Sequence, residues 1–327
     1  MLSRRKFLHN SMAAAAAAAA AGSVARLSAT PATAMALPLG LQLYSVREQL
    51  PKDWDGTLEA IAKMGYREVE AAGYDNHTAA QVNQSMKNAG LRLVSTHLGF
   101  DDLKSHMDEV LDFSHQLGLQ YIICPSPQMR NPPPPRPRPT AAQIAAMRAQ
   151  YARDGGRGRG NGFRPPQFTL DDWKYNAEQF NLFGEKINAA GMRFGYHNHT
   201  TEFTKVDGQV PLEVLIQNTD PDKVHFEMDC GWVVVGGGNP VALMRRYTNR
   251  FVMIHVKDFK PAAAGATGRA RMPSATELGR GEIDYTPIFA EARRIGIQHC
   301  FVEQEGFDIP WQQSLEADAA YLRKLGY

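Results

Sequence analysis

The chain has 327 residues, of which 43% are hydrophobic, and this composition is typical of a globular protein with a substantial core. Its formal net charge of +2 gives no electrostatic reason to expect a nucleic acid partner. The three cysteines, Cys124, Cys230 and Cys300, are widely spaced and form neither a zinc motif nor a disulfide framework, so we expect small buried side chains.

Residues 1–36 are predicted to be a signal peptide for the twin-arginine export machinery. Arg4 and Arg5 supply the paired arginines, an alanine-rich run follows at 12–21, and small residues at 32–36 offer a cleavage site. The run is too short and too poor in large apolar side chains for a membrane-spanning helix. The sequence therefore predicts a mature protein in the periplasm, and a low-complexity disordered tail is the alternative interpretation.

From Leu39 onward, strand and helix patterns alternate. Predicted strands cover 40–46, 66–73, 91–100 and 119–127, and predicted helices cover 53–64, 76–88 and 101–117. The alternation stops at 131–167, a basic insertion rich in proline and glycine that cannot bury a core. We expect a solvated loop with a short helix at 141–152, and a flexible lid over a substrate cleft is the alternative.

The alternation resumes after the insertion. Four more strands are predicted at 192–203, from 224, at 250–260 and at 299–307, and a loop rich in glycine and alanine covers 261–282. Eight strands alternating with helices indicate a parallel sheet, and residues 37–327 suffice for a single-domain (β/α)8 TIM barrel. An open doubly wound sheet is the alternative, although no glycine-rich phosphate fingerprint follows the first strand. The remaining predicted helices cover 169–191, 211–218, 240–247, 284–295 and 311–324.

Ionisable residues recur at the ends of the predicted strands. In VHFEMDCGWVVVGGG (224–238), alternation puts Glu227 and Asp229 on one face, and in RFVMIHVKDFK (250–260) it does the same for His255 and Lys257. A carboxylate and an imidazole at the ends of neighbouring strands can share a divalent metal. Because a TIM barrel gathers its strand ends at one face, these side chains are expected to converge. The other members of the group are Glu70, His97, His197, His199, Glu303 and Glu305.

Several motifs together resemble one known superfamily. These are MDCGW followed by GGGNP, then HVKD, LGRGEIDYTPIF and VEQE. From about Leu39 to its end, the chain resembles the xylose-isomerase-like sugar phosphate isomerase/epimerase superfamily, which includes tagatose epimerases, inosose dehydratases and an endonuclease branch. LQLYSVRE and GYHNHTTEF resemble the exported twin-arginine branch of that superfamily. The insertion at 131–167 lies outside the resemblance.

The resemblance implies one divalent metal ion, with manganese favoured and zinc, iron or cobalt as alternatives. Three ligands of the superfamily carry over onto Asp229, His255 and Glu303. The expected fourth ligand, a glutamate of the fifth strand, aligns with His197, so the fourth ligand is either His197 or Glu202, and we favour His197. Oxygen ligands combined with imidazole suit these transition metals better than calcium.

The resemblance also implies proton transfer next to a carbonyl group, through a metal-stabilised enediolate. Glu303 is the candidate base, and the second proton-transfer group is expected among His199, Lys257, Glu202 and His97. Lys257 has a structural alternative, an ion pair with Glu227 or Glu305. The side chains predicted to bind substrate are those of Glu70, His97, Glu227, Trp232 and Glu305.

The sequence thus predicts a metal-dependent sugar isomerase or epimerase. Export and the lack of an arginine–lysine cluster at the seventh and eighth strands favour an unphosphorylated sugar, keto-sugar, cyclitol or glycoside as substrate. A lyase or dehydratase acting on a keto-sugar or cyclitol at the same site is the first alternative. A non-catalytic periplasmic sugar-binding barrel and a phosphodiesterase of the endonuclease type are the others. Barrels of the superfamily commonly form dimers or tetramers, so a homo-oligomer is also an expectation.

Overall fold

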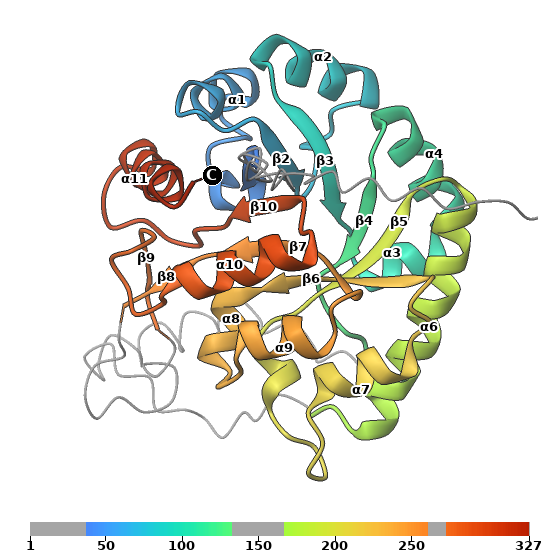
Figure 1. Ribbon diagram of the computed structural model, residues 1–327. Helices are drawn as coiled ribbons and strands as arrows, with labels where there is room; N and C mark the ends of the chain where they lie inside the picture. Colours follow the sequence, from blue (N-terminus) through green and yellow to red (C-terminus); the bar gives the residue numbers. More distant parts are fainter. Residues whose placement is uncertain (1–36, 133–166, 261–272, 327) are drawn as a thin grey trace, which may run out of the picture. The chain divides into compact units, whose positions relative to one another are not determined.

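Eight parallel strands close into a barrel with the helices around it (Figure 1). A computed structural model describes residues 37–132, 167–260 and 273–326 of the chain. The strands follow one another in the order β1-β10-β7-β6-β5-β4-β3-β2, and β1 pairs with both β10 and β2. This closure confirms the predicted (β/α)8 TIM barrel and excludes the open doubly wound sheet. The barrel strands are β1 (Leu39–Gln42), β2 (Glu68–Ala71), β3 (Arg92–His97), β4 (Tyr121–Cys124), β5 (Arg193–His197), β6 (Val224–Asp229), β7 (Phe251–Val256) and β10 (His299–Val302).

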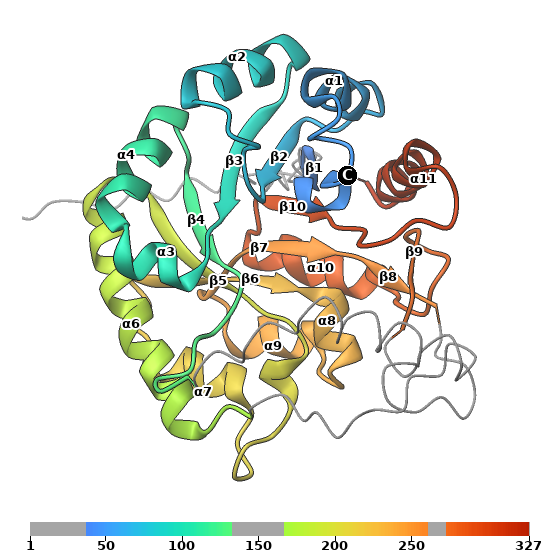
Figure 2. The ribbon, with the colours of Figure 1, turned by 180° about the vertical axis from the view of Figure 1, so that it is seen from behind.

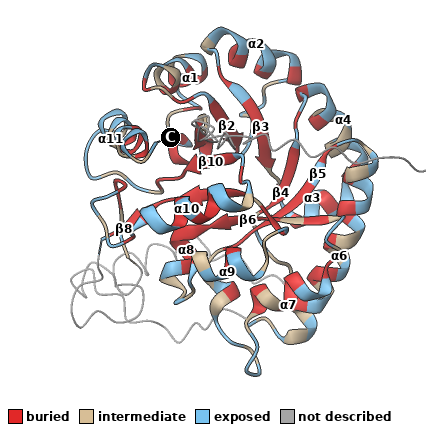
Figure 3. Ribbon diagram, viewed as in Figure 1, coloured by how far each residue is buried: buried red, intermediate tan, exposed pale blue. Residues whose placement is uncertain are grey.

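Amphipathic helices cover the outside of the barrel, with their buried residues toward the strands (Figure 3). Thr78 and Thr169 begin two of them, because each hydroxyl accepts a hydrogen bond from the amide three residues on. No helix among the described residues is long and apolar enough to cross a membrane. The helices are α1 (Trp54–Lys63), α2 (Ala79–Ala89), α3 (Phe100–Ser105), α4 (Met107–Leu117), α6 (Leu170–Ala189), α7 (Pro211–Asn218), α8 (Cys230–Val235), α9 (Pro240–Arg246), α10 (Tyr285–Ile295) and α11 (Trp311–Lys324).

The interior of the barrel changes from apolar to ionisable along the strands. A small apolar cluster that includes Met253 and Phe301 fills the middle of the barrel. Two residues further along β7 and just after β10, the same inward face carries His255 and Glu303. The apolar layer supports the fold, and the next layer toward the carboxyl ends of the strands forms a buried polar site.

Several predicted strands end earlier in the structure than in the sequence prediction. The first strand stops at Gln42, and Leu43–Val46 forms the 3-10 helix η1 because the Gln42 side chain accepts a hydrogen bond from the Tyr44 amide. The strand from 224 stops at Asp229, so the apolar run VVV belongs to helix α8. The Asp229 carboxylate accepts a hydrogen bond from the Trp232 amide and thereby begins that helix.

Other element boundaries also required correction. The predicted strand 192–203 ends at His197 and continues into the 3-10 helix η2 (Thr201–Phe203), and the last strand covers only His299–Val302. The predicted helix 101–117 is divided into α3 and α4 at His106, whose backbone leaves the helical region. The predicted signal peptide and the predicted helix at 141–152 lie outside the described residues.

The loop that carries the LGRGEID motif is held by one buried carboxylate. Asp258 follows β7 in the short strand β8 (Asp258–Phe259), which pairs with β9 (Ala275–Thr276). Its two oxygens accept hydrogen bonds from the amides of Gly279, Gly281 and Ile283. A Cβ atom at Gly281 would lie 2.0 Å from the Asp258 carboxylate, so this approach requires glycine. The motif therefore has a structural role.

A second buried carboxylate in this region makes stability depend on pH. Asp318 of α11 accepts a hydrogen bond from the Leu278 amide, but burial, together with Glu277 and Asp258, raises its pKa from 3.8 to about 7. The folded protein thus retains the proton up to about pH 7, whereas the unfolded chain releases it near pH 4. The free energy of unfolding is expected to fall as the pH rises between these values, by at most about 4 kcal/mol.

Asp318→Asn removes this titration. We expect the wild type to lose several degrees of melting temperature relative to the variant between pH 5 and pH 8. Thermal denaturation at both pH values measures the difference, and Glu316→Gln, an exposed carboxylate on the same helix, is the matched control. An equal change in Asp318→Asn and wild type would contradict the assignment.

Candidate functional site

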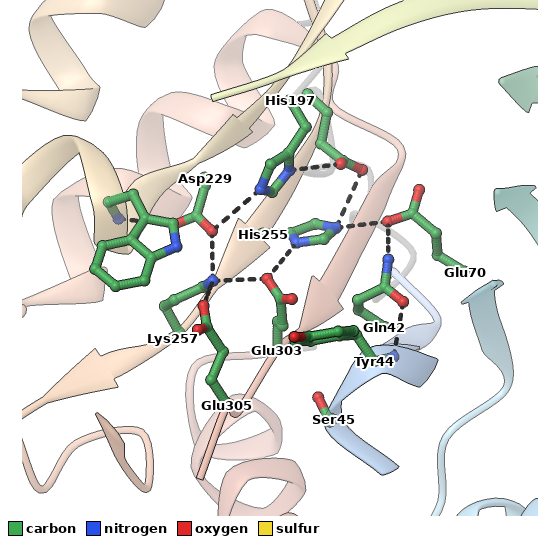
Figure 4. A network of polar contacts seen from close by, with 12 residues as sticks. Gln42, Tyr44, Ser45, Glu70, His197, Asp229, His255, Lys257, Glu303 and Glu305 are labelled. Carbon is green, nitrogen blue, oxygen red and sulfur yellow. Dashed lines mark hydrogen bonds and ion pairs between the residues drawn. The ribbon is translucent and has the colours of Figure 1, made fainter. Parts of the chain in front are cut away.

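Four predicted metal ligands converge at the carboxyl ends of the strands. His197, Asp229 and His255 end or lie within β5, β6 and β7, and Glu303 follows β10. Each offers a ligand atom, and these four atoms lie within 4.8 Å of one another (Figure 4). His197 Nε2 is 3.6 Å from Asp229 Oδ2, and His255 Nδ1 is 3.2 Å from Glu303 Oε2. We refer to these residues as the donor set.

Strand register accounts for this convergence. Asp229 of β6 lies opposite His255 of β7, and His197 of β5 lies opposite Glu227 of β6. Since β5, β6, β7 and β10 are consecutive in the barrel, inward side chains at their ends meet. All four members of the donor set are buried.

Two buried glutamates contact the other ring nitrogens of the donor set. Glu227 Oε2 lies 2.8 Å from His197 Nδ1, and Glu70 Oε1 lies 2.7 Å from His255 Nε2. Carboxylates in this position fix the ring orientation and tautomer of histidines that bind metals. The structure therefore places Glu70 and Glu227 behind the two histidines, on the side away from the donor set. The sequence analysis predicted that these two glutamates bind substrate, and that prediction stays untested.

His97 completes a second group of donors beside the first. Its Nε2 atom is 2.9 Å from both Glu70 Oε1 and Glu227 Oε2. His97, His197, Glu227 and His255 also present ligand atoms within 4.8 Å of one another. Burial opposes a positive charge on His97, but the two glutamates outweigh it and raise the pKa of the imidazole to about 10.

Lys257 links the donor set to Glu305. Its Nζ atom lies 2.6 Å from Glu303 Oε2, 2.8 Å from Asp229 Oδ2 and 2.8 Å from Glu305 Oε1. Burial opposes its charge, but the carboxylates dominate and hold the pKa of Lys257 well above its usual value. Of the two ion pairs considered for this lysine, the structure contains the one with Glu305.

Helix α8 gives Lys257 its position. The Trp232 ring lies beneath the ammonium group, with its centroid 5.0 Å from Nζ. A Cβ atom at Gly231 would lie 2.4 Å from Lys257 Cγ, so glycine leaves room for the lysine stem. The MDCGW motif thus contributes one candidate ligand, a glycine that admits Lys257 and a tryptophan that supports it.

The remaining predicted residues lie at one side of the donor set. The His199 ring is 4.9 Å from that of His197, and burial followed by the charges of its neighbours lowers the pKa of His199 to about 2. Glu202 is fully buried and accepts hydrogen bonds from the Tyr196 hydroxyl and the His199 amide. Among the described residues, both groups of donors contain His197 and neither contains Glu202. The arrangement therefore favours His197 as the fourth ligand.

The sequence analysis missed several supporting residues. Gln42 Nε2 and Ser95 Oγ donate hydrogen bonds to the two oxygens of Glu70, at 2.7 Å and 2.6 Å. Tyr44, in the 3-10 helix η1 that follows β1, is 42% exposed, and in the view of Figure 4 its ring points toward Glu303. Gln42 is a polar residue at the end of an apolar strand, so the pattern that identified the other candidates could have identified it.

The donor set fits a divalent cation. The carboxylates of Glu70, Glu227, Asp229 and Glu303 are buried around three histidines and Lys257. Buried carboxylates are costly unless cations compensate them. The charged forms of Lys257 and His97 compensate part of this charge, and a divalent cation would compensate the rest. Burial is the largest of the effects that lower the pKa of His197 to about 3, and a neutral imidazole is the form that binds metals. Imidazole and carboxylate together suit zinc, manganese, iron or cobalt.

Comparisons with known proteins agree with the fold. Residues 58–325 match the family described as xylose isomerase-like TIM barrel. The solved structure of a sugar phosphate isomerase/epimerase from Parabacteroides distasonis ATCC 8503 is 27% identical, with a TM-score of 0.67 over 89% of this chain and 96% of that one. A crystal structure of the IolI protein, which contains a zinc atom, shares the fold at 12% identity, with a TM-score of 0.61 over 88% of this chain and 97% of that one.

Several curated relatives carry the name inosose dehydratase. That of Clostridium tetani is 30% identical over 132 residues, 38% of this chain, and the match spans only 44% of its own length. A longer alignment, with the inosose dehydratase of Geobacillus kaustophilus, is 24% identical and covers 72% of this chain and 75% of that protein. Since the family match spans most of the described barrel, the chain belongs to the xylose isomerase-like TIM barrel family.

Proposed function

We propose that this protein is a metal-dependent enzyme that acts on an unphosphorylated carbohydrate by moving a proton next to a carbonyl group. The observation that carries the proposal is the contact between Glu303 and Lys257 at the edge of the donor set. A carboxylate and an ammonium group 2.6 Å apart supply a base and an acid within reach of one substrate carbon. A sugar-binding protein without activity would not require this pair next to metal ligands.

The donor set is proposed to hold one divalent ion through His197, Asp229, His255 and Glu303. When bound, such an ion polarises a carbonyl oxygen and stabilises negative charge as a proton leaves the neighbouring carbon. We favour manganese because carboxylates and imidazoles share the set, with zinc, iron and cobalt as alternatives. The zinc atom of the IolI protein supports a metal in a barrel of this fold.

The protein's own residues account for the proton transfers. Glu303 accepts the proton from the carbon next to the carbonyl, and Asp229 and Glu305 hold the Lys257 ammonium beside it. For isomerisation or epimerisation, a proton returns to carbon from Lys257, or through His199 after that imidazole has first accepted a proton, because its lowered pKa keeps it neutral.

Dehydration is the second candidate, and the names of the curated relatives favour it. Its first step is the same removal of a proton by Glu303. Lys257 then donates a proton to the hydroxyl group on the next carbon, the C–O bond breaks, water leaves and a carbon–carbon double bond forms. One constellation of side chains therefore serves both reactions, and the substrate decides between them.

The ion pairs of two lysines and the proposed export both favour an unphosphorylated substrate. Lys257 contacts three carboxylates and Lys260 pairs with Asp308, so the two lysines that follow β7 already have anionic partners. A phosphate group would have to compete with those carboxylates. We also propose that residues 1–36 direct twin-arginine export, which places the enzyme in the periplasm, away from cytoplasmic sugar phosphates.

The test is metal analysis followed by a substrate screen. Purified protein is expected to contain about one transition metal ion per chain. Keto-sugars, cyclitols and their glycosides are then incubated in deuterated water and followed by NMR and mass spectrometry. Deuterium in a product of unchanged composition indicates isomerisation or epimerisation, and loss of water indicates dehydration.

Other outcomes reject the proposal. A protein that binds no metal after manganese and zinc have been supplied, yet binds sugars, is a binding module. Two or more metals per chain would favour a phosphodiesterase, because the group formed by His97, His197, Glu227 and His255 would then also be occupied.

A further inference from the structure

A cavity of about 340 Å³ lies beside the donor set, between the segments that follow β1 and β10. β1 and β10 are paired neighbours in the barrel, as Figure 2 shows, so both segments emerge at the end of the barrel that carries the donor set. One segment contributes Ser45 and 47–49, and the other contributes 305–307 and Trp311. The volume is in the range of cavities that bind small molecules.

Glu305 connects this cavity to the reaction site. Its side chain lines the cavity, and its Oε1 atom is 2.8 Å from Lys257 Nζ. Lys257 in turn contacts Glu303 and Asp229. The side chain of Glu305 therefore borders both the cavity and the proposed proton-transfer groups.

The side chains of the cavity suit a polyhydroxylated ring. Trp311 and Phe307 are half-buried aromatic residues that pack on the core and face the cavity. Glu48 and Gln49 supply a carboxylate and an amide on the opposite segment. A sugar ring has apolar C–H faces that contact aromatic surface and hydroxyl edges that bond to such polar groups.

The wall of the cavity is held in place without a ligand. The Arg47 guanidinium donates hydrogen bonds to the carbonyl oxygens of Tyr44 and Glu305, at 2.9 Å and 3.1 Å, and lies over the Tyr44 ring. The backbone amide of Gln304 donates a hydrogen bond to Ser45 Oγ at 2.9 Å. These contacts join the two segments, and a cavity formed in advance costs less ordering when a ligand binds.

We propose that this cavity is a subsite for a second sugar ring, so that the enzyme acts on a disaccharide or other glycoside. The reacting ring lies at the donor set, and the ring attached to it lies against Trp311. The inference rests on the proposed function for the identity of the reacting ring, but occupancy of the cavity is measurable without turnover.

The test compares one-ring and two-ring sugars. Isothermal titration calorimetry of the metal-loaded full chain uses glucose as the one-ring probe and cellobiose, maltose, trehalose and sucrose as two-ring probes. Trp311→Ala is expected to lower the affinity for the two-ring probe that binds best about tenfold, which corresponds to about 1.4 kcal/mol of binding free energy. The affinity for glucose should change less than about twofold. Gln312→Ala, an exposed neighbour outside the cavity, is the matched control, and Trp311→Phe should retain most of the affinity because it keeps an aromatic ring.

Three outcomes overturn the inference. The subsite is refuted if the wild type binds none of the four two-ring probes, or if Trp311→Ala leaves the affinity for them unchanged. It is also refuted if Trp311→Ala lowers the affinity for glucose as much as the affinity for the two-ring probes. Failure of the proposed function looks different, because two-ring binding that depends on Trp311 without turnover of any sugar leaves the subsite standing. Conversely, turnover of one-ring keto-sugars that Trp311→Ala does not affect supports the function, and the binding measurements alone then decide the subsite.

Discussion

Asp229→Asn is expected to lower the metal content from about one ion per chain to a small fraction of that. Asparagine removes the negative charge that a divalent cation requires. Substituting residues that only support metal ligands already lowers metal affinity about 10–100-fold, so losing a ligand should lower it at least about 100-fold. Its side-chain oxygen can still accept the hydrogen bond from the Trp232 amide that begins α8. The variant therefore separates metal binding from folding. Elemental mass spectrometry after dialysis measures the metal, and thermal denaturation checks the fold.

Glu202→Gln is measured beside Asp229→Asn to test the rival fourth ligand, because Glu202 is an equally buried carboxylate on the adjoining segment. If His197 is the fourth ligand, Glu202→Gln retains the metal and His197→Gln loses it. The reverse result would assign the site to Glu202. Full metal content in Asp229→Asn would show that the donor set is wrong as drawn.

The alternation of side chains in β6, β7 and β10 made much of the site predictable. Because an inward-facing residue recurs at every second position of a strand, the sequence alone placed Glu227 and Asp229 on one face and His255 and Lys257 on one face. The barrel then brings the ends of these strands together, independently of the conformation of the loops. The fold class and the convergence of these residues follow from this periodicity, which the structure confirms.

Local hydrogen bonds and pairings between distant strands were not predictable in the same way. The VVV run of 233–235 has the composition of a strand, but the cap formed by Asp229 makes it helical. The contacts of Glu70 and Glu227 with the far side of the histidine rings depend on side-chain directions across the barrel. The cavity beside Glu305 joins segments about 260 residues apart in sequence, as the contact between Arg47 and Glu305 illustrates.

Lys257→Met is expected to lower turnover at least about 100-fold while metal content stays near one ion per chain. Methionine fills similar space against Trp232 but neither donates a proton nor balances Asp229, Glu303 and Glu305. Removing a cation next to the donor set does not remove a ligand, so the metal remains. Steady-state kinetics on the substrate found in the screen, with elemental analysis of the same sample, measures both quantities. Lys260→Met, which removes a partly exposed lysine paired with Asp308, is the control.

Lys257→Arg distinguishes the two roles of this lysine. Arginine keeps the positive charge between the carboxylates but does not give up a proton in proteins. If Lys257 transfers a proton, the arginine variant remains as slow as the methionine variant, with the loss in kcat rather than KM. If Lys257 only holds Glu303 and Glu305 in place, the arginine variant recovers most of the rate. A wild-type rate in Lys257→Met would remove Lys257 from the mechanism and leave His199 as the second proton-transfer group, since its ring is partly exposed and adjoins that of His197.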